Sequence, residues 1–321
     1  MERELTDRLP VHETATPADV DLVRVTEAAA LAAARFTGRG DQDRVKSVAA
    51  SAMLQALEEL GMGGRVILGP RGDGILSVGS IVGVEGGFDF GVYPVEGASL
   101  VSRGLPNAIS MVVAGPPGCF PSLPAVAYME KAVVGAPARG ALDLDDGVAD
   151  NLRRVAFARD CRVADLTVAV LDRPRHQGLI EEVRAAGARI LNLEDGDITG
   201  GLLAAADWTG VDAMLGIGGL QEAIMAACAV SCLGGDVQCR LWPRNDEERI
   251  LAGEDGARLY GAAELVPEGI AVAITGVTGG ALLGPVFYGG GFAQTQSLIL
   301  NARTGTVRRV TTRHQVTRPA S

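Results

Sequence analysis

The 321-residue sequence lacks the short motifs that mark several classes of enzyme. It has no Walker A loop, no G-x-S-x-G elbow and no HExxH segment. Its histidines, His12, His176 and His314, are too scattered to argue for a zinc site. The glycine-rich turn at residues 216–219 does not have the G-x-G-x-x-G spacing of a dinucleotide-binding loop. We therefore predict neither a zinc enzyme nor a dinucleotide-binding protein.

Long apolar runs and paired cysteines are also absent. No uninterrupted apolar segment reaches the roughly 18 residues of a membrane-spanning helix, and the opening MERELTDRLP contains acids and no apolar core of a signal peptide. The five cysteines form no C-x-x-C pair, so we expect most of them to be buried thiols in a reducing compartment. We therefore expect a cytoplasmic protein without a membrane partner.

Positive charge is scarce. The chain has 29 Lys and Arg against 39 Asp and Glu, and the resulting net charge of -10 would repel a nucleic-acid backbone. Nucleic acid is therefore not an expected partner. A small anion can still bind, because a few arginines and a helix N-terminus act at short range.

The residues that are present alternate in two ways. Apolar residues recur at helical spacing over residues 19–35 and 44–60, which predicts two helices. Short β-branched runs separated by glycine between residues 65 and 114 predict a sheet. Apolar strands and helices then alternate from residue 166 to the helix that starts at Leu220, which predicts a parallel sheet covered by helices. We place the boundary between the two halves within residues 140–160.

Ligands of such sheets bind at the carboxyl ends of the strands, where this sequence has charged residues. Arg173 and Arg175 follow a strand at the start of a helix, where two guanidinium groups and the helix dipole can hold a phosphate. An incidental basic pair on a solvated loop is the alternative. Asp195 and Asp197 either bind sugar hydroxyls or cap the next helix. Glu222, in the first turn of a helix, either complements the helix dipole or ligates a hard cation.

Eight segments, in this order, resemble the class II fructose-1,6-bisphosphatases. They are RVTEAAALAAARFTGRGD at 24–41, YMEK at 128–131, ADNLR at 149–153, RPRH at 173–176, DGD at 195–197, GIGG with Glu222, ITGVTGG from Ile274 and TVRRV from Thr306. The resemblance covers approximately residues 23–314. It implies the α/β fold of the lithium-sensitive sugar phosphatases, a layered sandwich of helices and mixed sheets in two subdomains.

The change in pattern divides the chain, and the family adds expectations about the loops and partners. After a polar lead over residues 1–18, we expect a helix-plus-sheet subdomain over 19–150 with the metal-site loops. An α/β subdomain over 151–321 would carry the sugar-phosphate-binding loops. The implied partner is a phosphorylated sugar, and the implied assembly is a homo-oligomer. Members of the family use magnesium or manganese to direct water at a phosphate ester.

Functional residues carry over from the family motifs in two groups. The implied substrate-binding residues are all present, namely Tyr128, Arg173, Arg175, Asp195, Asp197 and Gly219. The implied catalytic and metal-binding acids that remain are Asp41, Glu96 and Glu222.

Four positions depart from the family pattern. Tyr93 replaces an aspartate of the D-P-x-E-G-T box, and Ala98 replaces its threonine. Pro70 and Arg71 stand in an acidic loop that normally reads G-E-G-E, so a ligand carboxylate is lost and a guanidinium is added. Misalignment of this shortened loop is the alternative explanation. The changes predict a damaged metal site that holds one magnesium or manganese ion or none.

We therefore predict a sugar-phosphate-binding member of the family in which metal-dependent hydrolysis of the phosphate ester is impaired or altered. Two alternatives stay open. One is an active magnesium- or manganese-dependent fructose-1,6-bisphosphatase or related sugar phosphatase. The other is a non-catalytic sensor, or a partner subunit of an active paralogue.

Overall fold

A computed structural model of the chain describes residues 17–70, 72, 74–83 and 86–315. The predicted polar lead, up to residue 16, and the predicted site residue Arg71 lie outside the described residues. Both helices predicted in the first half are present with nearly the expected bounds. Within the described ranges, no helix is both long and apolar enough to span a bilayer.

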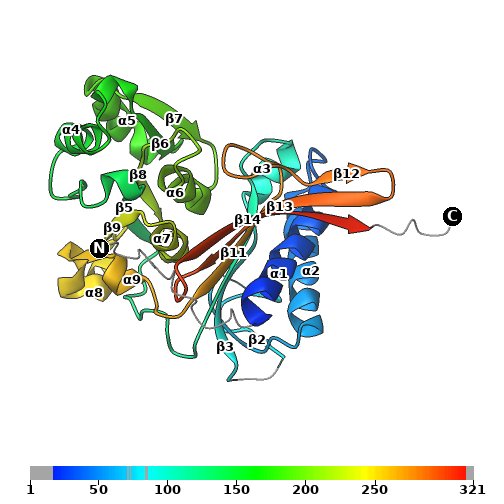
Figure 1. The fold of residues 1–321 in the computed structure, drawn as a ribbon. Coiled ribbons are helices and arrows are strands. Elements are labelled where there is room, and N and C mark those ends of the chain that lie inside the picture. Colours follow the sequence, from blue (N-terminus) through cyan, green and yellow to red (C-terminus); the bar gives the residue numbers. More distant parts are fainter. Residues whose placement is uncertain (1–16, 71, 73, 84–85, 316–321) are drawn as a thin grey trace, which may run out of the picture.

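Helices and sheets alternate in layers (Figure 1). Helices α1 and α2 pack on the outer face of a first sheet, α6 and α7 lie between that sheet and a second one, and α4 and α5 cover the outer face of the second sheet. The predicted layered α/β fold with mixed sheets is thus confirmed. The bounds of these helices are α1 (Pro17–Ala34), α2 (Gln42–Glu59), α4 (Val148–Ala158), α5 (Gln177–Ala185), α6 (Asp197–Ala205) and α7 (Leu220–Cys232).

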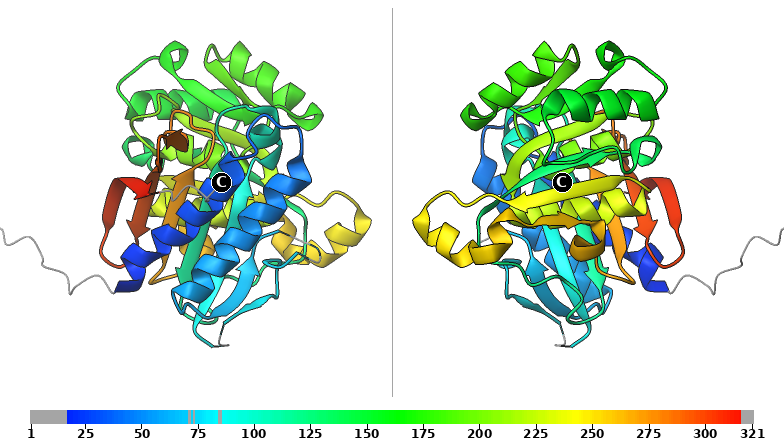
Figure 2. Two further views of the ribbon diagram at one scale, coloured as in Figure 1. Left: turned by 90° about the vertical axis from the view of Figure 1, so that its right-hand side faces the viewer. Right: turned by 90° about the vertical axis from the view of Figure 1, so that its left-hand side faces the viewer.

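Three shorter helices of the described part of the chain lie between consecutive strands. Figure 2 shows that α8 projects from the body of the molecule, and that α1 and α2 run side by side. The short α-helices are α3 (Ala98–Arg103), α8 (Asp246–Ala252) and α9 (Ala262–Leu265). The 3-10 turns span Ala136–Ala138, Val163–Asp165, Pro174–His176 and Gly253–Ala257.

The first sheet has the strand order β12-β13-β11-β4-β3-β1-β2, and β14 pairs with β13. Strands β1 and β3 are parallel, and the other neighbours in this sheet are antiparallel. Its strands are β1 (Gly64–Leu68), β2 (Ile81–Val82), β3 (Phe88–Glu96), β4 (Ile109–Gly115), β11 (Ala271–Gly276), β12 (Phe287–Gly289), β13 (Phe292–Asn301) and β14 (Thr306–Gln315).

The second sheet has the order β10-β9-β5-β8-β6-β7. The predicted parallel pairing holds for β6 with β7 and β8, but β5 runs antiparallel to β8 and β9, so the sheet is mixed. The carboxyl ends of β6, β7, β8 and β9 therefore meet the amino end of β5 at one edge. The strands are β5 (Tyr128–Val134), β6 (Thr167–Leu171), β7 (Arg189–Leu193), β8 (Ala213–Gly219), β9 (Asp236–Leu241) and β10 (Leu259–Gly261).

Sheet membership does not follow the predicted division near residue 150. Strand β5 precedes that point but lies inside the second sheet, and β11 to β14 follow it but belong to the first sheet. The reason is burial on both faces: every residue of β11 is buried, and the strand pairs with β4 on one side and β13 on the other. Such a strand is stable only inside a sheet.

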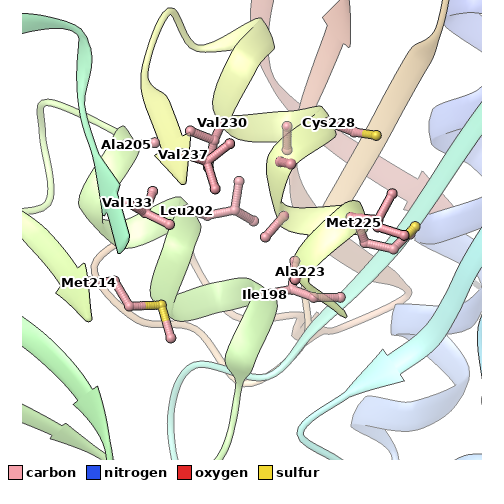
Figure 3. Packing of buried hydrophobic residues seen from close by; sticks show 14 of the residues in the cluster. Val133, Ile198, Leu202, Ala205, Met214, Ala223, Met225, Cys228, Val230 and Val237 are labelled. Carbon is pink, nitrogen blue, oxygen red and sulfur yellow. The ribbon is translucent and has the colours of Figure 1, made fainter. Parts of the chain in front are cut away.

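The core between the sheets depends on a close approach of α6 to the second sheet. Figure 3 shows Ile198 and Leu202 of α6 packed among residues of α7 and the strands, with Met214 of β8 beside them. A Cβ atom at Gly200 would lie 2.8 Å from the Met214 sulfur, which is closer than van der Waals contact allows. Glycine at this position therefore lets the first turns of α6, next to the candidate site, seat against the sheet.

Candidate active site

The six predicted substrate-binding residues lie at the edge where the strand ends meet. Tyr128 begins β5, the two arginines follow β6, the two aspartates follow β7, and Gly219 ends β8. Contacts link them in pairs. The Arg175 guanidinium lies 5.0 Å from the centre of the Tyr128 ring, an Arg173 nitrogen lies 3.9 Å from an Asp195 oxygen, and the Gly219 amide donates to Asp197.

Backbone carbonyls hold both arginines in place. Arg175 donates from Nε and Nη2 to the carbonyl of Ile217, at 3.2 and 2.9 Å. Arg173 donates from Nη1 to the carbonyls of Asp172 and Glu194, at 2.9 and 2.7 Å. Since their geometry is fixed before a ligand arrives, less side-chain entropy is lost on binding than for an unanchored loop.

The two aspartates do not cap α6. Asp195 accepts from the Ser99 hydroxyl at 2.6 Å and from the Gly196 amide at 3.0 Å. Asp197 pairs with the buried ammonium of Lys131, at 2.5 Å, and accepts from the Gly219 amide at 3.0 Å. The hydrogen bonds of these two side chains therefore do not cap the helix, which was one of the two roles predicted.

Glu96, at the end of β3, caps α6 instead. Its carboxylate accepts hydrogen bonds from the amides of Ile198 and Thr199 and from the Thr199 hydroxyl, at 2.5, 2.9 and 2.6 Å. Burial raises the pKa of the Glu96 carboxyl to about 8, against the opposing effect of these three hydrogen bonds. This candidate metal ligand is thus turned toward a helix N-terminus, where the dipole complements it.

Tyr93 faces the remaining acids. Its hydroxyl lies close enough to Glu222, in the first turn of α7, for that carboxylate to act on it electrostatically. Burial raises the pKa of Tyr93 first, and the charges of Glu222, Glu96 and Asp197 raise it further. The phenol therefore stays protonated beside Glu222. It lies near two of the three acids that the family resemblance associates with the metal, Glu96 and Glu222.

Glycine 219 makes room for the Glu222 side chain. A Cβ atom at Gly219 would lie 1.9 Å from the Glu222 Oε2 atom. The absence of a side chain at Gly219 thus leaves the space that the Glu222 carboxylate occupies.

The other predicted metal-side residues are placed as follows. Asp41 is exposed and caps α2, accepting from the Arg44 amide at 2.8 Å. Pro70 begins a loop. The amide of the preceding residue, Gly69, donates to the side chain of Gln221, which precedes Glu222 in the sequence. Pro70 and Tyr93 also contribute to the wall of a pocket of about 640 Å³ against α2. Ala98 is buried as the first residue of α3 and offers no hydroxyl.

A metal site is not assembled from these acids. The described part of the chain has no group of three or more His, Cys, Asp or Glu side chains arranged to hold a metal ion. Asp41, Glu96 and Glu222 are therefore not brought together around one position: the first caps α2, the second caps α6, and the third meets a phenol.

His176 connects two strands of the site edge. Its Nδ1 atom donates to the Leu171 carbonyl at 2.7 Å, and its Nε2 atom accepts from the Ile217 amide at 2.8 Å. This pair of bonds requires the neutral ring, and burial lowers its pKa. The ring thereby holds the end of β6, and the arginines that follow it, against β8.

Sequence reasoning missed three side chains of the edge. Lys131, which pairs with Asp197, is the last residue of the YMEK segment, so the motif could have indicated it as a site residue. Ser99 follows the altered Ala98, and no motif indicated its bond to Asp195. Arg244 lies 5.4 Å from the centre of the Tyr128 ring, and comes from a loop after β9 that contains no motif.

Comparisons with known proteins agree with the resemblance drawn from the segments. A family model described as bacterial fructose-1,6-bisphosphatase, glpX-encoded, matches residues 17–314. The chain is also similar to fructose-1,6-bisphosphatase 1 class 2 of Escherichia coli (strain K12) and to fructose-1,6-bisphosphatase class 2 of Shigella flexneri. Each is 33% identical over 322 residues, which cover 93% of this chain and 95% of the relative.

Proposed function

The chain belongs to the family of bacterial, glpX-encoded fructose-1,6-bisphosphatases, and from this we propose that it binds a phosphorylated sugar while its metal-dependent ester hydrolysis is impaired. The binding residues would be the six at the edge of the second sheet: Tyr128, Arg173, Arg175, Asp195, Asp197 and Gly219. The altered metal loops belong to the first sheet. Magnesium or manganese as the ion, a cytoplasmic location and self-association are further parts of the proposal.

The position of Tyr93 beside Glu222, where an aspartate stands in the family motif, carries this proposal. Magnesium and manganese prefer charged oxygen ligands, and a protonated phenol is not one. Two unit charges about 4 Å apart interact by roughly 4 kcal/mol at an effective dielectric near 20, so replacing an aspartate by tyrosine removes a large share of the attraction for a cation. The donor set therefore does not fit a two-ion centre.

Phosphate binding does not need the ions. Arg173 and Arg175 present planar, fixed donors at the start of α5, and such groups hold phosphate by charge-assisted hydrogen bonds. The carboxylates of Asp195 and Asp197 would accept from sugar hydroxyls. The outcome is a pocket that recognises the substrate without completing the reaction, which suits a sensor or a partner subunit of an active paralogue.

The retained acids favour a second candidate, an active phosphatase that works with one ion. Asp41 is exposed, and a single magnesium ion needs only one or two carboxylates besides water. Phosphate release separates the two candidates.

The test compares phosphate release by the unmodified protein and by the triple variant Pro70→Glu, Tyr93→Asp, Ala98→Thr. Substrates are fructose 1,6-bisphosphate and a panel of sugar phosphates, with magnesium or manganese present. We expect no release above background from the unmodified protein, a rise in its melting temperature with ligand, and measurable release from the variant. Tyr93→Phe is the matched control, since it removes the hydroxyl without adding a carboxylate, and it should stay inactive. Brisk turnover by the unmodified protein would overturn the proposal in favour of the second candidate.

A further inference from the structure

Two guanidinium groups approach the same aromatic ring at the site edge. The carbon at the centre of the Arg175 guanidinium lies 5.0 Å from the centre of the Tyr128 ring, and that of Arg244 lies 5.4 Å from it. The two arginines come from opposite sides of β5 in the sheet. Arg175 follows β6, which is reached through β8, and Arg244 follows β9. The sheet order therefore brings distant segments to one ring.

Both arginines are anchored through the same edge of the guanidinium. Arg175 uses Nε and Nη2 on the Ile217 carbonyl, and Arg244 uses Nε and Nη2 on Glu248 Oε1, at 2.9 and 2.5 Å. The Glu248 side chain is itself buried and also accepts from the Arg244 amide. Among the described residues, neither Nη1 group has a hydrogen-bond acceptor within the protein. Each arginine thus presents one nitrogen with two free protons.

The charges around the ring favour an anion. Glu248 balances the charge of Arg244, but Arg175 is held by a carbonyl, so the pair of guanidinium groups keeps a net positive charge. Planar donors of this kind match the oxygens of a phosphate group, which carries close to two negative charges near pH 7. Trp242, edge-on to Tyr128 with ring centres 6.2 Å apart, forms an apolar wall beside them.

We propose that Arg244 is a phosphate-binding residue of this pocket, and that its Nη1 group and that of Arg175 bind one phosphate group of the sugar beside Tyr128. This inference rests on the proposed function, because it assumes that a sugar phosphate enters the edge. It adds a specificity residue: a sugar without a phosphate at this end gains nothing from the arginine pair. The phosphate is held at the strand ends of the second sheet.

The test is calorimetric titration of fructose 6-phosphate into the full-length protein and its variants. Arg244→Gln should weaken the affinity by about tenfold or more, the usual loss for one charge-assisted hydrogen bond. Arg244→Lys should give an intermediate loss, because lysine keeps the charge but cannot bind Glu248 and phosphate together. Arg258→Gln is the matched control. It removes an arginine that stacks at 5.0 Å on a tyrosine of the same sheet, Tyr260, and should leave affinity within about twofold.

A double variant of Arg175 and Arg244 tests whether they share one phosphate. If they do, the loss in Arg175→Gln/Arg244→Gln should be smaller than the product of the single losses, because the first change already releases the shared group. An Arg244→Gln affinity equal to that of the unmodified protein, together with a weakened Arg175→Gln, would overturn this inference and leave the proposed function standing. Binding of inorganic phosphate that depends on Arg244, without binding of the sugar phosphate, would show that Arg244 binds phosphate but would contradict the proposed function and the sugar part of the inference. Failure to bind either probe would overturn both.

Discussion

Replacing Lys131 by methionine should destabilise the protein strongly, because the lysine is the buried partner of a site carboxylate. Its Nζ atom lies 2.5 Å from Asp197 Oδ1, and the two side chains are 1% and 11% exposed. Removing one member of a buried ion pair leaves the other charge without compensation, which costs about 3–5 kcal/mol. An exposed pair of nearly equal length gives the contrast. Arg103 and Glu194 meet at 2.6 Å, but their side chains are 49% and 52% exposed, so breaking that pair should cost about 1 kcal/mol or less.

Urea unfolding of three variants measures the difference. Lys131→Met should lower the free energy of unfolding by about 3 kcal/mol or more, and Glu194→Gln by less than about 1 kcal/mol. Lys131→Met combined with Asp197→Asn should recover most of the loss, since the double change leaves no unpaired charge and the asparagine can still accept from Gly219. A loss below about 1 kcal/mol in Lys131→Met would refute the reasoning, because it would mean that the ammonium is solvated in the folded protein.

Three further perturbations test neighbouring parts of the site. His176 is neutral in the fold, and burial lowers its pKa. Its contribution to the free energy of unfolding should therefore be complete above about pH 6.5, the value in the unfolded chain, and be lost as the pH falls below it. The free energy of unfolding should then fall by up to about 1.4 kcal/mol per pH unit. Unfolding measured between pH 7.5 and 5 checks this, and His176→Gln should remove that part of the slope. Gly219→Ala should displace the Glu222 carboxylate and weaken binding of fructose 6-phosphate. An unchanged affinity would mean that α7 moves to make room for the added methyl group. Glu96→Ala removes the cap of α6 and should cost about 2 kcal/mol in unfolding free energy, and a change near zero would exclude a capping role.

Local pattern was sufficient to predict the elements with strong periodicity. The first two helices and the strand–helix succession after residue 166 follow from side-chain spacing alone. The β-branched runs between residues 65 and 114 were expected to form the sheet, yet of the described residues 77–83 only Ile81–Val82 form a strand. Glycines at 79 and 83 explain this, because both have positive φ angles that end a strand on either side.

Pairing between distant segments was beyond what periodicity can predict. Strand β11 inserts between β4 and β13, and nothing in its own residues identifies those neighbours. The division near residue 150 was placed by a change in local pattern, which carries no information about sheet order. Edge residues such as Arg175 could be predicted because each follows a strand, and strand ends converge in any parallel arrangement.

Contacts between layers explain the other gaps. The sequence predicts that Tyr93 replaces an aspartate, but not that its hydroxyl reaches Glu222, since this depends on the spacing of the first sheet and α7. Likewise, Glu96 was interpreted as a metal ligand because the motif retains it, and its bonds to α6 follow from the packing of that helix against β3. Arg244 stands outside every motif and reaches Tyr128 only through the order of the strands.

In the proposed function, the phosphate-binding half of the pocket works without the cation-binding half. Titration of fructose 1,6-bisphosphate into the unmodified protein, in excess chelator and again with magnesium or manganese, tests it most directly. We predict a dissociation constant that differs by less than about twofold between the two conditions, with the ligand recovered intact. Binding that disappears in chelator, or that tightens by about tenfold or more with metal while phosphate is released, would contradict the claim.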